Sequence, residues 1–164
     1  MPPSKIGIKP GGTLTLDAAL KILLVKSAND IAIVVAEHLS GSVDAFVEEM
    51  NREAARLGMK ESRFMNPNGL FADGQQTSAR DMALLGRRLF LDFPRSASLF
   101  SIPAIQIGKR VMDNTNGIIG RYPGATGLKT GFICASGFNV VASAQKNGRR
   151  LIVVVFGASS GAER

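Results

Sequence analysis

Two short polar motifs in the sequence carry side chains that could do chemistry. The first, Ser27-Ala28-Asn29, separates two apolar segments with a hydroxyl and an amide. If this break is extended, the two-residue period of extended chain points both side chains into one cleft. Such residues are also ordinary helix caps, because their oxygens accept hydrogen bonds from free backbone N–H groups. Taken alone, the motif leaves both a cap and a functional site open.

Lys129-Thr130-Gly131, at the start of a β-like run, is the second motif. A charged Lys within a largely apolar strand needs a partner or a cleft. The following Gly removes a side chain and would let a ligand or another backbone come close. An edge strand with a solvated Lys is the structural alternative, since such residues protect edges from aggregation.

Helices are expected to fill the first hundred residues. Apolar periodicity predicts helices over 17–25, 31–39 and 43–57, with Thr15 and Ser42 as N-caps. A fourth helix is expected to begin after Ser78, which would form a capping box with Asp81, and to end at Phe93-Pro94.

Strands are expected in the last part of the chain. β-like runs cover residues 102–108, 128–134, 138–145 and 150–156, and Asn147-Gly148 predicts a tight hairpin between the last two. Helices followed by an antiparallel sheet indicate an α+β fold.

Composition excludes several classes of protein. The 164 residues indicate one domain or a piece of one, and 45 % hydrophobic with 20 % charged residues excludes disordered and fibrous chains. The net charge of +7 suits anionic surroundings, but with no Trp and one Tyr a base-stacking nucleic-acid module has little support. One Cys and one His predict neither a disulfide nor a metal site, and no cofactor is expected. Cys134 with His38 as a thiol catalytic pair is a minor alternative.

Together, in this order and on these elements, the two motifs resemble the penicillin-binding protein and serine β-lactamase superfamily. More specifically, the chain resembles the D-alanyl-D-alanine carboxypeptidases, the low-molecular-mass penicillin-binding proteins of serine peptidase family S11. The resemblance is carried by residues 24–30 (LVKSAND), 46–51 (FVEEMN), 57–59 (LGM), 64–70 (FMNPNGL), 77–81 (TSARD) and 127–132 (GLKTGF). It implies a partial β-lactamase/penicillin-binding-protein transpeptidase-like fold. Residues 1–164 would then be part of the catalytic domain, with a helical part over about 13–100 and a sheet part over about 101–164.

One motif of that family is missing upstream of Ser27. Family members carry a Ser-x-x-Lys whose Ser is acylated and whose Lys activates it, and the only match here is Ser143 to Lys146. That match follows Lys129-Thr130-Gly131, where the family has no nucleophile, so it is set aside as chance. We therefore expect a chain truncated at its N-terminus, without a nucleophile and inactive alone. A signal peptide, the family's C-terminal domain and its membrane anchor are also expected to be absent.

The resemblance implies catalytic roles for three residues. Ser27 would pass a proton toward the leaving amine, Asn29 would hold the substrate amide, and Lys129 would keep the cleft positive. The reaction that the resemblance implies is the removal of D-Ala from D-Ala-D-Ala stem peptides of peptidoglycan through an acyl-enzyme, which would serve cell-wall metabolism and cell shape. The resemblance also implies that β-lactam antibiotics bind the complete enzyme and that its location is the periplasm or cell envelope.

Substrate-binding roles are implied for residues further along the chain. Thr130 would bind the terminal carboxylate, and the N–H of Phe132, just past Gly131, would be one oxyanion donor. Arg164 would grip a carboxylate with paired donors, with a frayed terminal Arg as the alternative.

Three further expectations remain open beside this one. A pseudoenzyme or split subunit would bind stem peptides without cleaving them, which fits the missing motif. A β-lactamase-like hydrolase is a lesser alternative. Missing elements would also leave a sheet edge exposed, so self-association of the chain is expected.

Overall fold

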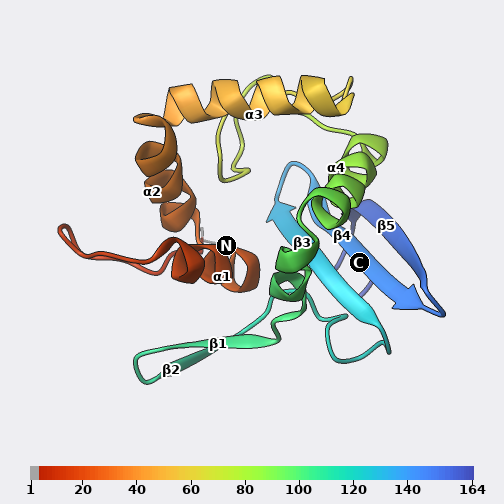
Figure 1. The fold of residues 1–164 in the computed structure, drawn as a ribbon. Coiled ribbons are helices and arrows are strands. Elements are labelled where there is room, and N and C mark those ends of the chain that lie inside the picture. Colours follow the sequence, from red (N-terminus) through yellow and green to blue (C-terminus); the bar gives the residue numbers. More distant parts are fainter. Residues whose placement is uncertain (1–3) are drawn as a thin grey trace.

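Residues 4–164 are described by a computed structural model, which has a helical part and a sheet part (Figure 1). The α+β expectation is confirmed. Four α-helices precede one 3₁₀ helix, a two-stranded ribbon and a three-stranded sheet. They are α1 (Leu16–Lys26), α2 (Asn29–Ser40), α3 (Val43–Leu57), α4 (Ala79–Asp92), η1 (Pro94–Ser101), β1 (Ala104–Ile107), β2 (Arg110–Asp113), β3 (Ala125–Ile133), β4 (Gly137–Lys146) and β5 (Arg149–Ala158).

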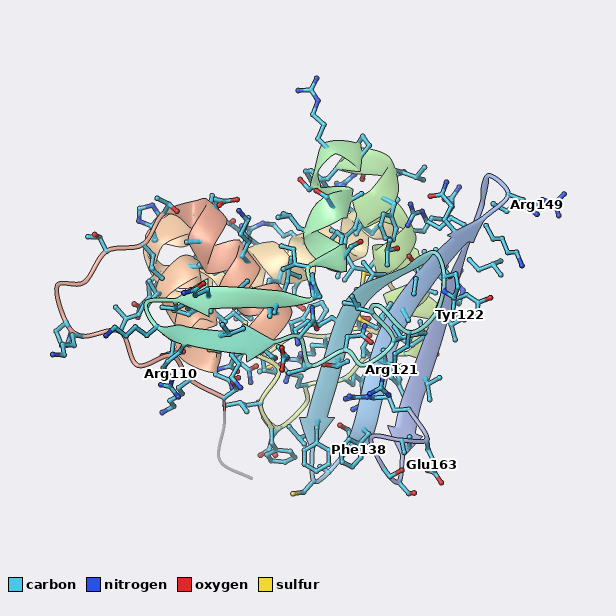
Figure 2. All side chains as sticks on the ribbon, turned by 90° about the horizontal axis from the view of Figure 1, so that it is seen from below. Arg110, Arg121, Tyr122, Phe138, Arg149 and Glu163 are labelled. Atoms are coloured by element: carbon cyan, nitrogen blue, oxygen red, sulfur yellow. The ribbon has the colours of Figure 1, made fainter. Side chains whose placement is uncertain are left out.

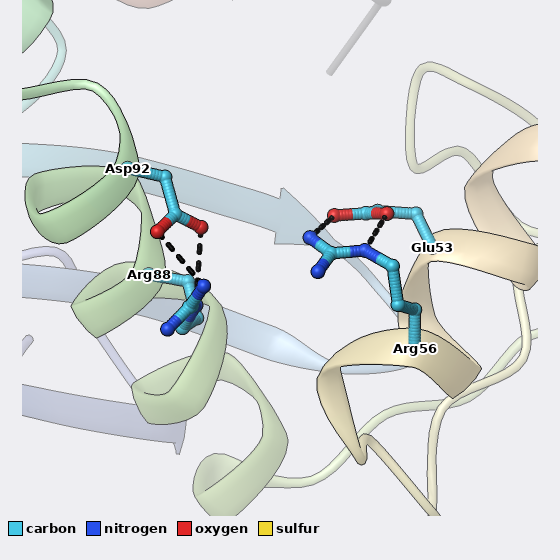
Figure 3. Close-up of polar contacts among 4 residues, drawn as sticks. All are labelled: Glu53, Arg56, Arg88 and Asp92. Carbon is cyan, nitrogen blue, oxygen red and sulfur yellow. Dashed lines mark hydrogen bonds and ion pairs between the residues drawn. The ribbon is translucent and has the colours of Figure 1, made fainter.

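The helix boundaries follow from capping residues. The side chain of Thr15 accepts from the N–H of Ala18 at the start of α1, and Ser42 accepts from Ala45 at the start of α3. Gly58 ends α3 in the left-handed conformation that glycine adopts without steric cost. Exposed ion pairs then join successive turns, Glu53 with Arg56 on α3 and a second pair on α4 (Figure 3).

Only one of the two hydrogen bonds of the capping box expected at α4 forms. Ser78 accepts from the N–H of Asp81, as expected. The Asp81 carboxylate is fully buried and accepts instead from the Glu61 N–H and the Ser62 hydroxyl, both at 2.8 Å. Its pairing with the preceding loop therefore replaces the return bond to the cap.

The break between α1 and α2 is shorter than expected, and it is not extended. Ser27 has φ 55° and ψ 44°, a left-handed conformation that ends α1. Only Ala28 then separates it from α2, which begins at Asn29 rather than at residue 31. The expectation that Ser27 and Asn29 share a direction through a local strand is therefore wrong.

The main sheet is antiparallel in the order β3-β4-β5. The hairpin turn at Asn147-Gly148 is confirmed, with φ 50° and 72° at the two residues. The short ribbon β1–β2 is separate from this sheet, and only its first strand was expected. Helix η1 was also not expected, because its start at Pro94 reads equally well as a loop.

Two packing regions hold the parts together. Ala19, Ile22, Ala28 and Ile31 form a buried cluster between α1 and α2, against which β1 packs. Helix α4 lies across the sheet (Figure 1), where Gly86 permits close approach: a Cβ there would lie 3.0 Å from Leu128 Cδ1. None of the helices within residues 4–164 has the length and apolar content needed to cross a bilayer.

Candidate active site

The end of helix α1 and strand β3 meet at one polar contact. Lys129 Nζ donates to Ser27 Oγ at 2.7 Å and to the Thr130 carbonyl oxygen at 2.6 Å. The two side chains come from positions 102 residues apart. The structure thus brings together one residue from each of the two motifs.

A bulge in β3 sets the direction of Lys129. The register of β3 against β4 shifts between Gly127 and Lys129, so that Lys129 pairs with Val141. Such a bulge re-aims the side chains that follow it. The loop before β3 fits closely here, since a Cβ on Gly127 would lie 2.9 Å from Ile119 Cδ1.

The ammonium of Lys129 is largely withdrawn from water and has no acidic partner. None of the ion pairs among residues 4–164 includes it. Burial, with a smaller contribution from the nearby positive charge of Arg164, lowers the pKa of Lys129 from 10.5 to about 8. Near neutral pH this side chain therefore remains mostly charged while holding a measurable neutral fraction.

Arg164 is anchored at this site. Its Nη2 donates to the carbonyl oxygen of Thr115 at 3.3 Å, and its guanidinium lies 5.8 Å from the ring of Phe138. The Thr115 hydroxyl is in turn 2.8 Å from that of Thr130, which is only 6 % exposed. Figure 2 shows Phe138 at the same end of the sheet as the C-terminal turn that carries Glu163. Arg164, Thr115 and Thr130 therefore form a polar network beside Lys129.

Asn29 has a different partner. Its side-chain Nδ2 and its backbone N–H both donate to the carbonyl oxygen of Ser4, at 3.1 and 2.8 Å. The Ser4 hydroxyl donates to the carbonyl oxygen of Lys26. The amide of the Ser-x-Asn motif thus fixes the N-terminal segment against the turn between α1 and α2.

Beyond Thr130, the outer side of β3 is open. Gly131 is exposed, and a Cβ placed on it would meet no atom within 4 Å. Phe132 is partly exposed and lies against Phe138 with ring centroids 4.3 Å apart. Because β3 is an edge strand of the sheet formed by residues 4–164, an extended ligand has room beside it.

Comparison with known proteins shows to which family the chain belongs. A family model described as D-alanyl-D-alanine carboxypeptidase, peptidase family S11, matches residues 2–160. The chain belongs to this family.

Members of the D-alanyl-D-alanine carboxypeptidase family are similar to this chain in sequence. The chain is 38 % identical to DacF of Bacillus subtilis over 98 % of its length and 36 % identical to DacA of Escherichia coli K12 over 92 %. It spans only 42 % and 38 % of those two relatives.

Solved structures of the family agree in fold. Penicillin binding protein 5 from Haemophilus influenzae matches 98 % of the chain with a TM-score of 0.93 at 34 % identity, and the chain covers 47 % of it. Penicillin-Binding Protein D2 from Listeria monocytogenes in its ampicillin-bound form matches 99 % with a TM-score of 0.88 at 29 % identity, and the chain covers 68 % of it. The chain therefore has the penicillin-binding-protein fold over its own length. It spans about half, or less, of the length of several relatives.

The minor alternatives find no geometric support. Cys134 is exposed just after β3, whereas His38 lies in the last turn of α2. Residues 4–164 contain no group of three His, Cys, Asp or Glu that could hold a metal ion.

A cavity of about 340 Å³ lies where β3 begins and β4 ends, lined by Tyr122, Pro123, Gly124, Gln145 and Lys146. It contains neither Ser27 nor Lys129.

Thr115 and Ser4 are the site neighbours that sequence reasoning missed. Thr115 lies in a turn-rich stretch where Thr is unremarkable, and its backbone N–H donates to the Val25 carbonyl at the end of α1. Ser4 lies in a segment read as loop. Neither carries a local signal, because each acts through a contact with a distant element.

Proposed function

We propose that the chain forms one wall of the active site of a serine-type D-Ala-D-Ala carboxypeptidase acting on peptidoglycan stem peptides. The observation that carries this is the 2.7 Å contact between Lys129 Nζ and Ser27 Oγ, in a chain that belongs to the family. In this function Ser27 relays a proton to the leaving amine, since a hydroxyl both donates and accepts. Lys129 supplies positive charge beside it.

The open edge of β3 is proposed to bind the peptide. The N–H of Phe132, past Gly131, would be an oxyanion donor, and Thr130 and Arg164 would bind the terminal carboxylate. Support comes from the network that joins Arg164 to Thr130 through Thr115. Because Asn29 Nδ2 already donates to Ser4, its proposed contribution is through the amide oxygen or after release of that bond.

We further propose that residues 1–164 alone do not turn over substrate. The sequence has no Ser-x-x-Lys before Ser27, and cleavage of the peptide bond by the family's covalent route needs the serine of that motif. In the complete enzyme the same wall would face β-lactam antibiotics, in the periplasm or cell envelope.

A hybrid protein tests the assignment. The part of Bacillus subtilis DacF that precedes the matched region is joined to this chain and incubated with a fluorescent penicillin. We expect the hybrid to be labelled and the chain alone to remain unlabelled. In the hybrid, Lys129→Met should abolish labelling, and the exposed Lys146→Met should not. A folded hybrid labelled equally well with and without Lys129 contradicts the proposal.

A non-catalytic peptide-binding protein is the second candidate, favoured by the same absence of Ser-x-x-Lys. Titration of the chain with a peptide ending in D-Ala-D-Ala separates the two. A binding module saturates and discriminates against an L-Ala-L-Ala peptide, whereas an incomplete site shows no saturable binding.

A further inference from the structure

The contact between Ser27 and Lys129 contains the parts of a nucleophile and its base. Ser27 Oγ is half-buried and lies 2.7 Å from Nζ, within range for direct proton transfer. The backbone of Ser27 is held in place, because it caps α1 in a left-handed conformation with its N–H bonded to the Leu23 carbonyl, and its hydroxyl is held by the contact with Lys129. Non-glycine residues held in this conformation cluster at functional sites.

We propose that Ser27 Oγ is itself a nucleophile toward activated aryl esters, with Lys129 as its general base, so that the chain has an acyl-transfer activity of its own. This goes beyond the proposed carboxypeptidase function, in which Ser27 only relays a proton and another residue is acylated. The proposed nucleophile, Ser27, and its base, Lys129, both belong to this chain.

The step balances with an aryl ester and water alone. Ser27 Oγ bonds to the ester carbonyl carbon as its proton passes to neutral Lys129 Nζ. The bond from that carbon to the phenol oxygen then breaks, which yields acyl-Ser27 and a phenolate. The proton on Lys129 passes to the phenolate or to solvent. Water attacks acyl-Ser27, releases the carboxylic acid and restores the hydroxyl.

Three features of the fold favour this step. Helix α2 begins two residues after Ser27, so Ser27 lies next to the positive end of its dipole, which favours negative charge nearby. The space beside Gly131 is open to a flat aryl group. A phenolate leaves without protonation, so the reaction needs no general acid, unlike cleavage of a peptide bond.

The reaction requires Lys129 in its neutral form. The groups that face its ammonium are the Ser27 hydroxyl, the Thr130 carbonyl oxygen and the positive charge of Arg164. With the pKa of Lys129 lowered to about 8, the acylation rate should rise with pH and level off above that value.

The experiment uses p-nitrophenyl acetate with the 164-residue chain, checked for native far-UV circular dichroism. We expect a burst of nitrophenolate and one acetyl group on the peptide that contains Ser27. Ser27→Ala should remove that label. Lys129→Met should slow its formation at least about tenfold. The control Lys146→Met, and the chain unfolded in urea, separate this labelling from general acetylation of surface lysines.

Two results would overturn the proposal. One is a folded chain with no acetyl group on the Ser27 peptide. The other is labelling at Ser27 whose rate is unchanged by Lys129→Met or that persists in urea. Neither touches the carboxypeptidase assignment, which is read from penicillin labelling of the hybrid protein at a different serine.

Discussion

Ser27 combines a strained backbone with a hydroxyl whose only described side-chain partner is Lys129. A left-handed conformation costs a residue with a Cβ roughly 1–2 kcal/mol, a cost that glycine does not bear. The contact with Lys129 offsets part of that cost.

Ser27→Gly should therefore be more stable than Ser27→Ala by about 1 kcal/mol, although both lose the hydroxyl. Urea unfolding of the two variants measures this difference. Equal stabilities, or a more stable alanine variant, would show that the left-handed conformation of residue 27 is not kept in solution.

Lys129 should make stability depend on pH. Its folded-state pKa of about 8 lies below the ordinary 10.5, so between these values the unfolded chain binds more protons. The free energy of unfolding should therefore rise as pH increases from about 8 toward 10.5, by at most roughly 3 kcal/mol, and stay at its lower level below pH 8. Urea titrations at a series of pH values measure this rise. Lys129→Met should flatten it, whereas a rise that survives in this variant belongs to other groups.

At the level of elements, the contact between α4 and the sheet depends on one missing side chain. Gly86 leaves room for Leu128, Val141 and Ile152, all within 3.5 Å of where its Cβ would be. Leu128 directly precedes Lys129, so this contact also supports the site.

Gly86→Val should destabilise the chain by about 1–3 kcal/mol, because it overpacks this contact. The matched control is Arg87→Val on the exposed side of the same helix, which should cost only the lower helix propensity of Val, below about 1 kcal/mol. Thermal unfolding of the two variants decides. A smaller loss of Tm for Gly86→Val than for Arg87→Val would contradict the packing described.

The sequence predicts elements better than it predicts how they meet. Thr15, Ser42 and Gly58 mark helix ends because caps act locally, and Asn147-Gly148 marks its hairpin for the same reason. The left-handed Ser27 was missed because serine carries no signal for that conformation. The partners of Asp81, Asn29 and Thr130 were missed because each lies on another element. The residue types of the candidate site were readable, but the network through Thr115 was not.

Across the whole molecule, the far edge of the sheet is apolar. Leu151 and Val153 on β5 are 69 % and 55 % exposed, and β5 has no neighbour on its outer side within residues 4–164. Exposed edges of this kind pair with other chains. Figure 1 shows this edge on the side of the sheet away from α1 and α2, so association there leaves Lys129 uncovered.

We expect residues 1–164 to self-associate in a concentration-dependent manner through this edge. Val153→Lys should shift the distribution toward monomer, because a charged edge residue opposes pairing. Val111→Lys on the β1–β2 ribbon, where the valine is even more exposed at 67 %, should not. Sedimentation velocity at several concentrations measures both. A wild-type chain that stays monomeric throughout contradicts this expectation.

The 102-residue separation between Ser27 and Lys129 has a kinetic consequence. Contacts between such distant positions raise the contact order, and a high contact order slows folding. A small molecule that bridges the two residues would bind only molecules in which α1 and β3 are both in place. Its binding would raise the melting temperature by an amount set by its concentration and its Kd, so the contact would report a fold in which these two elements have met.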